Sequence, residues 1–567
     1  MASDGTGVDP DGFYRPKSEA DIVQLVKKAY AEGKQIRCRG SVHSVAHAIY
    51  TDPGPGDPNV PNKVSVQSPP EGPNLNLLLD DYAGLAWIDE ARGVVEVDAG
   101  LHLGADPNAP DQNASLKDSL LYQAFEKGWT LRDLGGITHQ TISGFIATGS
   151  SGGSLQYGID KNIVAFRVID GTGEVLWVDE ETNADLFFAL GTSMGLLGII
   201  SKVRLKLTPT FNVYGQEATT RTAVEECPVD LFNVGCDGKP NLRQFLETTP
   251  YARILWWPQQ GAERAVFWQA VAGPPLDAFT PLPYIEWTGS PLENTVEQLA
   301  ASIFYTLVGN LDDLKAVPGK LKDDFEVFDD AIALLLKQLG LGKLASEVLA
   351  KILTGALEGL TDAAILLLQD ELRTILPKAF PKLIDLFQPL SGDKPKVFMD
   401  YAWRSLPMDN AVNDTLLNTE FTEIWIPLEY TERTMQLLAS YFEEGGTQAT
   451  GFFSTELYSA KESKFWLSPS FGGPVFRVDP FWFADNAGDP AAKGGFFDGF
   501  WRLLRDNDVP FRLHWGKFLP EYDFADWAAY LRSQYPRWDD FMTLRKQRDP
   551  KDIFLTDYWR RHLLGET

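Results

Sequence analysis

The sequence contains few cysteines, which are Cys38, Cys227 and Cys236 among 567 residues. An odd and sparse count does not indicate a disulfide framework, although the spacing leaves open a bridge between Cys227 and Cys236. The opening residues MASDGTGVDPDG have neither the basic nor the apolar region of a secretory signal, and no run of about 18 apolar residues predicts a membrane span. We therefore expect a cytoplasmic protein without a transmembrane segment.

Basic residues are scarce relative to acidic ones, because 51 Lys and Arg stand against 78 Asp and Glu, a net charge of −27. A nucleic-acid surface needs clustered Lys and Arg. No such cluster is present, so we do not expect a nucleic-acid partner. The hydrophobic share of 44% is ordinary for globular proteins and excludes disorder as the main state. At about 100–200 residues per domain, the length predicts two or three domains.

Several motifs that mark common enzyme classes are missing. The six histidines do not occur in HExxH and there is no CxxC pair, so we expect no metal site. GxSxG is absent, which weakens a serine-hydrolase interpretation. Neither a GK[ST] phosphate loop nor a GxGxxG turn after a strand is present.

The region up to residue 208 is predicted to be α+β, with short strands and loops. Residues 14–33 predict a helix with a capping box at Ser18 and Asp21 and a stop at Gly33. The strand KQIRCRG follows and places His43 in the loop after it. Further predicted elements are a loop at 51–73, strands at 86–89 and 94–100, a helix at 113–128, a hairpin at 164–178 around Asp170 and Gly171, and a helix, turn and strand at 185–207.

The rest of the chain mixes strands and helices around one helical block. Residues 209–290 are expected to carry strands, among them ARILWWP and AVFWQAV. Residues 291–390 repeat apolar residues at helical period and predict a block of helices. Strands resume at PKVFMDYAW and FTEIWIPLEY, a helix covers ERTMQLLASYFEEG, and helices close the chain after FRLHWGK. These elements predict an α+β fold class.

The segment GGITHQTISGFIATGSSGGSLQYG at 135–158 is dense in glycine and hydroxyl side chains. Glycine lets backbone N–H groups approach a ligand closely, and hydroxyls add donors. This combination suits a pyrophosphate without a basic residue. A flexible surface loop is the alternative.

The segment FRLHWGK carries a histidine and a lysine in apolar surroundings. As a strand, it would place Arg512, His514 and Gly516 on one face, with Lys517 on the other unless the glycine bends the chain. His514 and Lys517 are then either a pair that handles a proton or solvated groups at a strand edge.

Glu456 in FFSTELYSA is flanked by Phe452, Phe453 and Tyr458. An apolar setting raises the pKa of a carboxyl group, and such a group can orient a substrate hydroxyl. The alternative is an exposed strand glutamate.

Four segments occur in an order typical of one family: RPKSEADIVQLVKKA, RCRGSVHS, GGITHQTISGFIATGSSGG and SMGLLGIISKVRLKL. Together they resemble the FAD-binding domain of the vanillyl-alcohol oxidase family. LHWGK and RWDDFMTLRKQRDPKDIF resemble the end of the aldonolactone and alditol oxidases of that family. The resemblance covers residues 14–208 and, less closely, 420–565, and does not cover 285–395.

The resemblance implies an α+β protein with a two-subdomain PCMH-type FAD-binding domain in residues 1–208. Residues 209–520 would form an α+β cap domain that binds the substrate, including the helical insertion at about 291–390. Residues 521–567 would return to the FAD domain. The oligomeric state is not predicted.

The resemblance also implies FAD as the cofactor, covalently bound through His43 of the RGxxHS pattern. The Gly-rich segment would cradle the pyrophosphate, and residues 198–200 would lie on the adenine side. No cysteine lies where some relatives form a second flavin bond, so we expect a single bond. The implied cofactor-binding residues are Arg39, Gly40, Ser41, Val42, His43, Ser44, Gly135, Gly136, Thr141, Ser143, Gly144, Thr148, Gly149, Ser151, Gly152, Gly198, Ile199 and Ile200.

The implied reaction is oxidation of a C–OH group of a small-molecule substrate. Hydride would pass to flavin N5, and O2 would accept the electrons and give H2O2, unless another electron acceptor serves. Lys517 or His514 would act as the base or hold the forming alkoxide, and Glu456 and Tyr458 would orient the substrate. A flavin-binding protein of the same fold without this catalysis is the alternative.

Two positions depart from the family pattern, because Tyr458 stands where relatives have arginine and Ser151 where many have histidine. The branch implies a sugar-lactone or polyol-like substrate. The helical block, rich in Leu, Ile and Ala, would also suit a larger apolar pocket for a bulkier hydrophobic alcohol, since covalent-flavin sterol oxidases have enlarged caps. The alternative is a block that serves only packing or oligomerisation.

Overall fold

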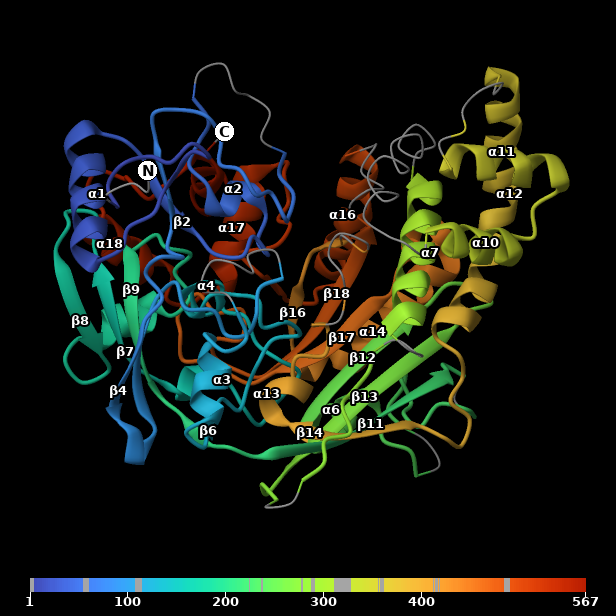
Figure 1. Ribbon diagram of the computed structural model, residues 1–567, viewed down its shortest axis with the longest axis horizontal. Coiled ribbons are helices and arrows are strands. Elements are labelled where there is room, and N and C mark those ends of the chain that lie inside the picture. The colour runs from blue at the N-terminus through green and yellow to red at the C-terminus, as the bar shows by residue number, and fades with distance from the viewer. Residues whose placement is uncertain are drawn as a thin grey trace.

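The computed structural model describes residues 5–566 apart from 55–60, 108–114, 224, 236–237, 277–278, 287–290, 310–327, 355, 357–360, 411, 413–416, 418 and 484–489. Within these ranges the chain is α+β, with its strands arranged in four sheets. Both chain ends lie on one side of the molecule, and the largest sheet and its helices lie on the other (Figure 1).

A small parallel sheet leads into the loop that carries His43. Helix α1 (Glu19–Glu32) begins with both halves of the predicted capping box at Ser18 and Asp21, and Gly33 ends it at φ 65°. Strand β2 (Ile36–Arg39) follows and pairs with β3 (Leu75–Leu78), which pairs with β1 (Phe13–Tyr14). The predicted helix and strand are confirmed. A short helix, α2 (Ala46–Ile49), comes after the loop.

A five-stranded antiparallel sheet completes the N-terminal region, in the order β4-β5-β9-β7-β8. The predicted strands and hairpins are confirmed as β4 (Leu85–Asp89), β5 (Val94–Asp98), β7 (Ile163–Ile169), β8 (Val175–Asp179) and β9 (Ile199–Lys206). Helices α4 (Ile142–Thr148) and α5 (Ala184–Leu190) accompany them, and β6 (Trp129–Thr130) pairs with β10 (Thr208–Pro209).

The helix expected over 113–128 is shorter than predicted. Helix α3 runs only over Leu120–Phe125, because Ser119 acts as the N-cap and its hydroxyl accepts the N–H of Tyr122. Residues 113–114 lie outside the described part of the chain.

The largest sheet joins strands that are far apart in the sequence. Its order is β14-β11-β13-β12-β17-β18-β16-β19, with β15 also paired to β18. The strands are β11 (Asn212–Arg221), β12 (Tyr251–Trp257), β13 (Arg264–Gly273), β14 (Lys396–Tyr401), β15 (Thr419–Phe421), β16 (Ile424–Pro427), β17 (Thr455–Ala460), β18 (Val475–Phe483) and β19 (Arg512–Leu513).

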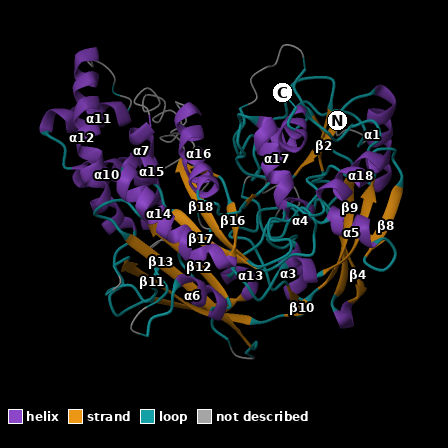
Figure 2. Ribbon diagram, turned by 180° about the vertical axis from the view of Figure 1, so that it is seen from behind, coloured by secondary structure: helices purple, strands orange, loops and turns teal. Residues whose placement is uncertain are grey.

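Helices pack against this sheet. Figure 2 shows α6 (Leu242–Thr248) and α14 (Thr431–Gly445) beside strands of this sheet. Phe245 of α6 packs on Phe267 of β13, and Phe442 of α14 packs on Trp256 of β12. Helices α13 (Ala402–Ser405), α15 (Thr447–Thr450) and α16 (Pro490–Asp506) lie in the connections.

The predicted helical block is confirmed and has an apolar core of its own. It consists of α7 (Pro291–Gly309), α10 (Phe328–Leu339), α11 (Lys343–Leu353) and α12 (Asp362–Phe387). Phe304, Leu335, Leu349 and Phe380 are among its buried residues, and Trp257 at the end of β12 belongs to the same cluster. The insertion is therefore packed against the large sheet.

The C-terminal segment returns to the N-terminal region through α17 (Phe524–Gln534), α18 (Trp538–Arg548) and α19 (Asp557–Trp559). The N–H of Ile36 donates to Ile553 O at 2.8 Å, and Arg37 Nη1 donates to Phe554 O at 3.2 Å. No helix within the described ranges is long and apolar enough to cross a membrane. Cys38 and Cys227 carry free thiols, whereas Cys236 lies outside the described residues.

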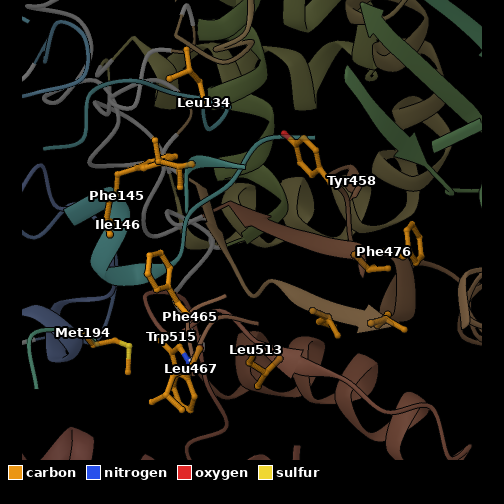
Figure 3. Close-up of a cluster of buried hydrophobic side chains, with 14 of the residues drawn as sticks. Leu134, Phe145, Ile146, Met194, Tyr458, Phe465, Leu467, Phe476, Leu513 and Trp515 are labelled. Carbon is orange, nitrogen blue, oxygen red and sulfur yellow. The ribbon is translucent and has the colours of Figure 1, made fainter. Parts of the chain in front are cut away.

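One continuous core connects the two sides of the molecule. Phe145 of α4, Tyr458 of β17, Phe465 and Trp515 are buried in the same cluster (Figure 3). Trp515 Nε1 donates to Leu467 O at 2.9 Å. The Gly-rich segment, β17 and the segment after β19 are thus held against one another.

Candidate active site

A first cavity lies in the N-terminal region and has a volume of about 1190 Å³. Its walls come from the loop after β2, from α4, from the residues leading into β9 and from the C-terminal segment. Most residues predicted to bind the cofactor line it, namely Arg39, Gly40, Ser41, Val42, His43, Ser44, Thr141, Ser143, Gly144, Thr148, Gly198, Ile199 and Ile200. Three segments distant in the sequence therefore converge on one cavity.

The loop that carries His43 is held by backbone hydrogen bonds on both sides. The N–H of Val45 donates to Gly516 O at 2.9 Å, and the N–H of Ser65 donates to Val42 O at 2.9 Å. Val42 has φ 56°, which is uncommon for a β-branched residue and is found mainly where the surrounding structure imposes it. The fold thus fixes the backbone next to His43.

The His43 ring lies where the two largest sets of candidate site residues meet, and its state can be described. Its Nε2 atom is buried and has no hydrogen-bond partner in the described part of the chain. Burial lowers the pKa of His43 well below its usual value, and the neighbouring His139 and Lys517 add to the effect. The ring is therefore neutral at neutral pH, and a neutral ring nitrogen is a nucleophile.

The Gly-rich segment is ordered rather than a flexible loop, because it contains helix α4. Thr141 Oγ1 accepts the N–H of Gly144 at 3.2 Å at the start of the helix, and Gly149 ends the helix at φ 75°. Gly40 approaches so closely that a Cβ atom there would lie 2.8 Å from Thr141 Oγ1. A side chain at position 40 would push the His43 loop away from α4.

Two of the hydroxyl groups expected to donate to a phosphate are already used. Ser143 Oγ donates to Ala99 O at 2.8 Å, and Thr148 Oγ1 donates to Gly144 O at 3.0 Å. A hydroxyl has one proton, so in this arrangement neither side chain can donate to a phosphate. At these two positions, donors for an anion must therefore come from the backbone.

A second cavity of about 1540 Å³ lies between the Gly-rich segment and the large sheet. His43, Gln140, Ser150 and Lys517 line both cavities. The second one is also lined by Gly135, Gly136, Ser151, Glu456 and Tyr458. The two cavities therefore meet beside His43 and Lys517.

Gly149 and Gly152 were predicted to bind the cofactor, but neither lines a described cavity. A Cβ atom at Gly149 would lie 3.1 Å from Thr192, and one at Gly152 would lie 2.2 Å from Leu134 O. Packing inside the protein is sufficient to account for glycine at these two positions, and their contact with the cofactor stays a prediction.

Glu456 and Tyr458 lie two residues apart on β17 and are both buried. The interpretation of Glu456 as an exposed strand residue is therefore wrong. Burial raises the pKa of Glu456 to about 8, and Asp409 adds to the rise. Burial also raises the pKa of Tyr458 well above its usual value. Both groups are protonated at neutral pH and can donate hydrogen bonds.

The neighbouring strand supplies two charged residues that the sequence reasoning missed. The register of β17 and β18 pairs Tyr458 with Arg477 and Glu456 with Asp479. Arg477 Nη2 donates to Asp479 Oδ2 at 2.7 Å. In FRVDP the two charges stand two residues apart within an apolar strand, and this alternation could have indicated that they share a face.

Arg477 also connects the sheet to the rest of the site. Its Nη2 donates to Glu423 Oε2 at 2.9 Å, and its Nη1 donates to Ser151 O at 3.1 Å. Burial opposes ionisation of Glu423, but the nearby His514, Arg477 and Lys517 outweigh it and lower the pKa of this carboxyl below its usual value. Glu423 is therefore ionised.

A second buried arginine lies on the other side of β17. Arg253 of β12 pairs with Asp409, and its Nη1 lies 3.7 Å from Glu456 Oε1. The second cavity itself is lined by acidic and basic side chains from several segments, among them Asp409, Glu456, Arg477 and Lys517. The described residues contain no group of three or more His, Cys, Asp or Glu side chains that could bind a metal ion.

Lys517 and His514 both reach the first cavity because the chain turns after β19. The strand ends at Leu513, and the N–H of Lys517 donates to His514 O at 3.0 Å. The chain is therefore bent before Lys517, the possibility left open at Gly516, whereas the interpretation as a solvated strand edge is wrong, since His514 is buried and Lys517 half-buried. Lys517 Nζ donates to His43 O at 2.9 Å.

The proton on His514 can be assigned. The N–H of Gly516 donates to His514 Nδ1 at 3.2 Å, so this nitrogen is an acceptor. Burial lowers the pKa of His514 to about 4. The ring is therefore neutral and carries its proton on Nε2, which makes it a hydrogen-bond donor toward its other neighbours.

The sequence model of the D-arabinono-1,4-lactone oxidase family matches residues 379–562. The enzyme of that name from Kluyveromyces lactis is 27% identical over 283 residues, which are 50% of this chain and 44% of that protein. The one from Saccharomyces cerevisiae is 30% identical over 209 residues, 36% of this chain and 33% of that protein. The chain thus spans less than half the length of these yeast relatives.

Two further similarities extend over nearly the whole chain. L-gulono-1,4-lactone dehydrogenase of Mycobacterium tuberculosis is 23% identical over 558 residues, which cover 98% of this chain and 96% of that protein. The crystal structure of cholesterol oxidase from Brevibacterium sterolicum shares the fold, with a TM-score of 0.60 at 15% identity over 97% of this chain and 93% of that chain. The sequence comparisons confirm the predicted resemblance to the aldonolactone oxidases.

Proposed function

We propose that this chain, a relative of the aldonolactone oxidases, is an FAD-dependent oxidoreductase that oxidises a C–OH group of a sugar lactone or a related cyclic alcohol. The meeting of the two cavities beside His43 and Lys517 carries the proposal. One cavity has the glycines and backbone groups that suit a dinucleotide. The other has buried charged groups that suit a hydroxyl-bearing donor.

The residues of the first cavity fit FAD. Gly198 has φ 138° and a Cβ atom there would lie 2.5 Å from Ile169 O, so only glycine keeps this wall open. Backbone groups from residues 40–44 and 141–144 would hold the pyrophosphate, and Gly198, Ile199 and Ile200 would lie on the adenine side. His43 Nε2, which lacks a partner among the described residues, would form the covalent bond to the flavin.

This assignment divides the chain into an FAD-binding domain and a cap domain. Residues 1–208 together with 521–567 would form the two-subdomain PCMH-type domain that binds FAD. Residues 209–520 would form the cap over the substrate, with the helical insertion as part of it. The backbone hydrogen bond from Ile36 to Ile553 supports the return of the C-terminal segment to the first domain.

Bound FAD would accept a hydride from the carbinol carbon and pass its electrons to O2 or another acceptor. Lys517 Nζ would hold the substrate oxygen as its proton leaves, because a cation stabilises the developing negative charge. Glu423 is ionised and lines the second cavity, so it can accept that proton. His514 would donate a hydrogen bond from Nε2 rather than act as the base.

Glu456 and Tyr458 would orient the substrate as hydrogen-bond donors, since both are protonated at neutral pH. Arg477 supplies from β18 the positive charge that relatives place at the position of Tyr458. The site therefore contains an arginine even though Tyr458 stands at the position where relatives have one.

The proposal is tested by adding D-arabinono-1,4-lactone or L-gulono-1,4-lactone to the purified protein without oxygen. The flavin absorbance should bleach and should return in air with formation of H2O2. Bleaching that is reversed by an artificial acceptor but not by air would indicate a dehydrogenase, the activity named for the mycobacterial relative. A yellow protein that no lactone or alcohol reduces would leave only a flavin-binding scaffold, and a protein that stays colourless after addition of FAD would overturn the proposal.

A further inference from the structure

Aromatic side chains form much of the wall of the second cavity. Trp257, Tyr305, Phe421, Phe453 and Phe481 all line it, together with aliphatic residues. Buried acidic and basic groups such as Glu456 and Arg477 line another part of the same cavity. The cavity therefore has a polar part and an apolar part.

The aromatic rings follow one another in a continuous series. Lys517 Nζ lies 4.0 Å from the centre of the Phe421 ring. Phe421 stacks on Phe481 at 4.5 Å, Phe481 on Phe453 at 5.8 Å, and Phe453 on Tyr305 at 4.8 Å between ring centres. The series leads from the lysine beside His43 to helix α7, so the apolar wall extends from the proposed reaction site into the insertion.

The helical insertion contributes directly to this wall. Ala301 and Tyr305 of α7 and Phe387 of α12 line the cavity, and Tyr305 is buried. Helix α7 lies outside residues 379–562, which match the lactone-oxidase family. Part of the apolar wall is thus built from a segment that the family match does not include.

We infer that the natural substrate is a ring-bearing alcohol or lactone whose large apolar group lies against Trp257, Tyr305 and Phe453, while its C–OH group lies among the charged residues beside Lys517. The inference rests on the proposed function and specifies its substrate class. A bare sugar lactone has no apolar surface to cover these rings, whereas a flat apolar substituent removes both its own surface and theirs from water. Such a group can also stack on the aromatic faces.

The test compares two donors that differ only in an apolar group, D-arabinono-1,4-lactone and its 5-O-benzyl ether. The concentration dependence of anaerobic flavin reduction in the holoprotein gives Kd and the limiting rate separately. Burial of the benzyl group should tighten binding by about 10- to 100-fold. Tyr305→Leu and Phe453→Leu, which keep apolar volume but remove a ring, should each bring the ratio of the two Kd values closer to one. Phe279→Leu is the control, because Phe279 packs edge-to-face on Tyr401, with 5.1 Å between ring centres, and does not line the cavity.

Equal or weaker binding of the benzyl ether by the native protein, or a ratio that neither variant changes, would overturn the inference while lactone oxidation could stand. If neither donor reduces the flavin, the proposed function fails. The apolar site is then tested separately by calorimetric measurement of ligand binding. Tighter binding of benzyl than of methyl β-D-arabinofuranoside would then support the site, and equal binding of the two would overturn it.

Discussion

Arg477 and Tyr458 are directly opposite each other on β18 and β17, with the guanidinium carbon 4.8 Å from the centre of the tyrosine ring. The same guanidinium donates to Glu423 and Asp479. The positive charge that relatives carry on β17 is thus present in the site on the neighbouring strand. An arginine fixed by two carboxylates also has little freedom to move, which suits a group that positions a substrate.

Replacement of Arg477 by lysine should slow flavin reduction by about 10-fold or more, the factor that corresponds to about 1.4 kcal/mol. Lysine keeps the charge but cannot make the paired contacts of a guanidinium. Stopped-flow reduction with a saturating donor measures the effect, and Arg502→Lys, at an exposed position paired with Asp498, is the control. Arg477→Gln should in addition lower the free energy of unfolding by about 3–5 kcal/mol, because it leaves buried carboxylates unpaired. A reduction rate unchanged in Arg477→Lys would remove Arg477 from the site.

Replacement of Lys517 by methionine should slow flavin reduction by about 100- to 1000-fold, as expected for loss of one group that stabilises a developing oxyanion. The yellow colour should remain, because the hydrogen bond from Lys517 Nζ goes to the backbone oxygen of His43. Lys464→Met is a matched control, since Lys464 also lies over an aromatic ring, 4.7 Å from the centre of Phe187. An unchanged reduction rate would show that Lys517 takes no part in the reaction.

Glu456 should make the stability of the protein depend on pH. Burial raises the pKa of Glu456 from 4.5 to about 8, so the folded state keeps a proton that the unfolded chain releases. The native protein therefore loses stability as the pH rises between these values. Glu456→Gln has no proton to release at this position. Its free energy of unfolding should therefore increase relative to that of the native protein as the pH rises over that range. Thermal denaturation across the pH range checks this, with Glu443→Gln at an exposed position as the control; parallel curves for Glu456→Gln and the native protein would contradict the raised pKa.

The sequence predicted those parts of the fold that depend on local signals. The capping box at Ser18 and Asp21 and the stop at Gly33 defined α1, and β2 placed His43 in the loop that follows. Helical periodicity likewise identified the insertion at 291–390. These elements form where they do because their signals lie within a few residues of the structure they determine.

The parts that the sequence did not predict depend on contacts between distant segments. The pairing of Tyr458 with Arg477 follows from the register of two strands, which no local pattern specifies. The turn that brings Lys517 beside His514 follows from the end of β19 at Leu513, where pairing with β16 stops. At Gly149 and Gly152 the sequence cannot separate two reasons for glycine, because a position that needs glycine for packing and one that needs it for contact with a ligand look the same.

Replacement of His43 by alanine tests the covalent bond to the flavin. Acid precipitation of the native protein should leave the yellow colour in the pellet, and the same treatment of His43→Ala should release it to the supernatant. The loop should keep its shape in the variant, because its hydrogen bonds use the backbone of Val42, His43 and Val45. Any FAD that His43→Ala retains before precipitation is therefore bound by the cavity alone.

His47→Ala is the control for this experiment, because His47 lies in the adjacent helix α2 and packs against Tyr558 rather than lining the first cavity. Its pellet should stay yellow. Colour that remains in the pellet of His43→Ala would show that another side chain carries the flavin. Colour released from the native protein would show that FAD is held without a covalent bond, in which case the neutral ring of His43 would serve only to line the site where the two cavities meet.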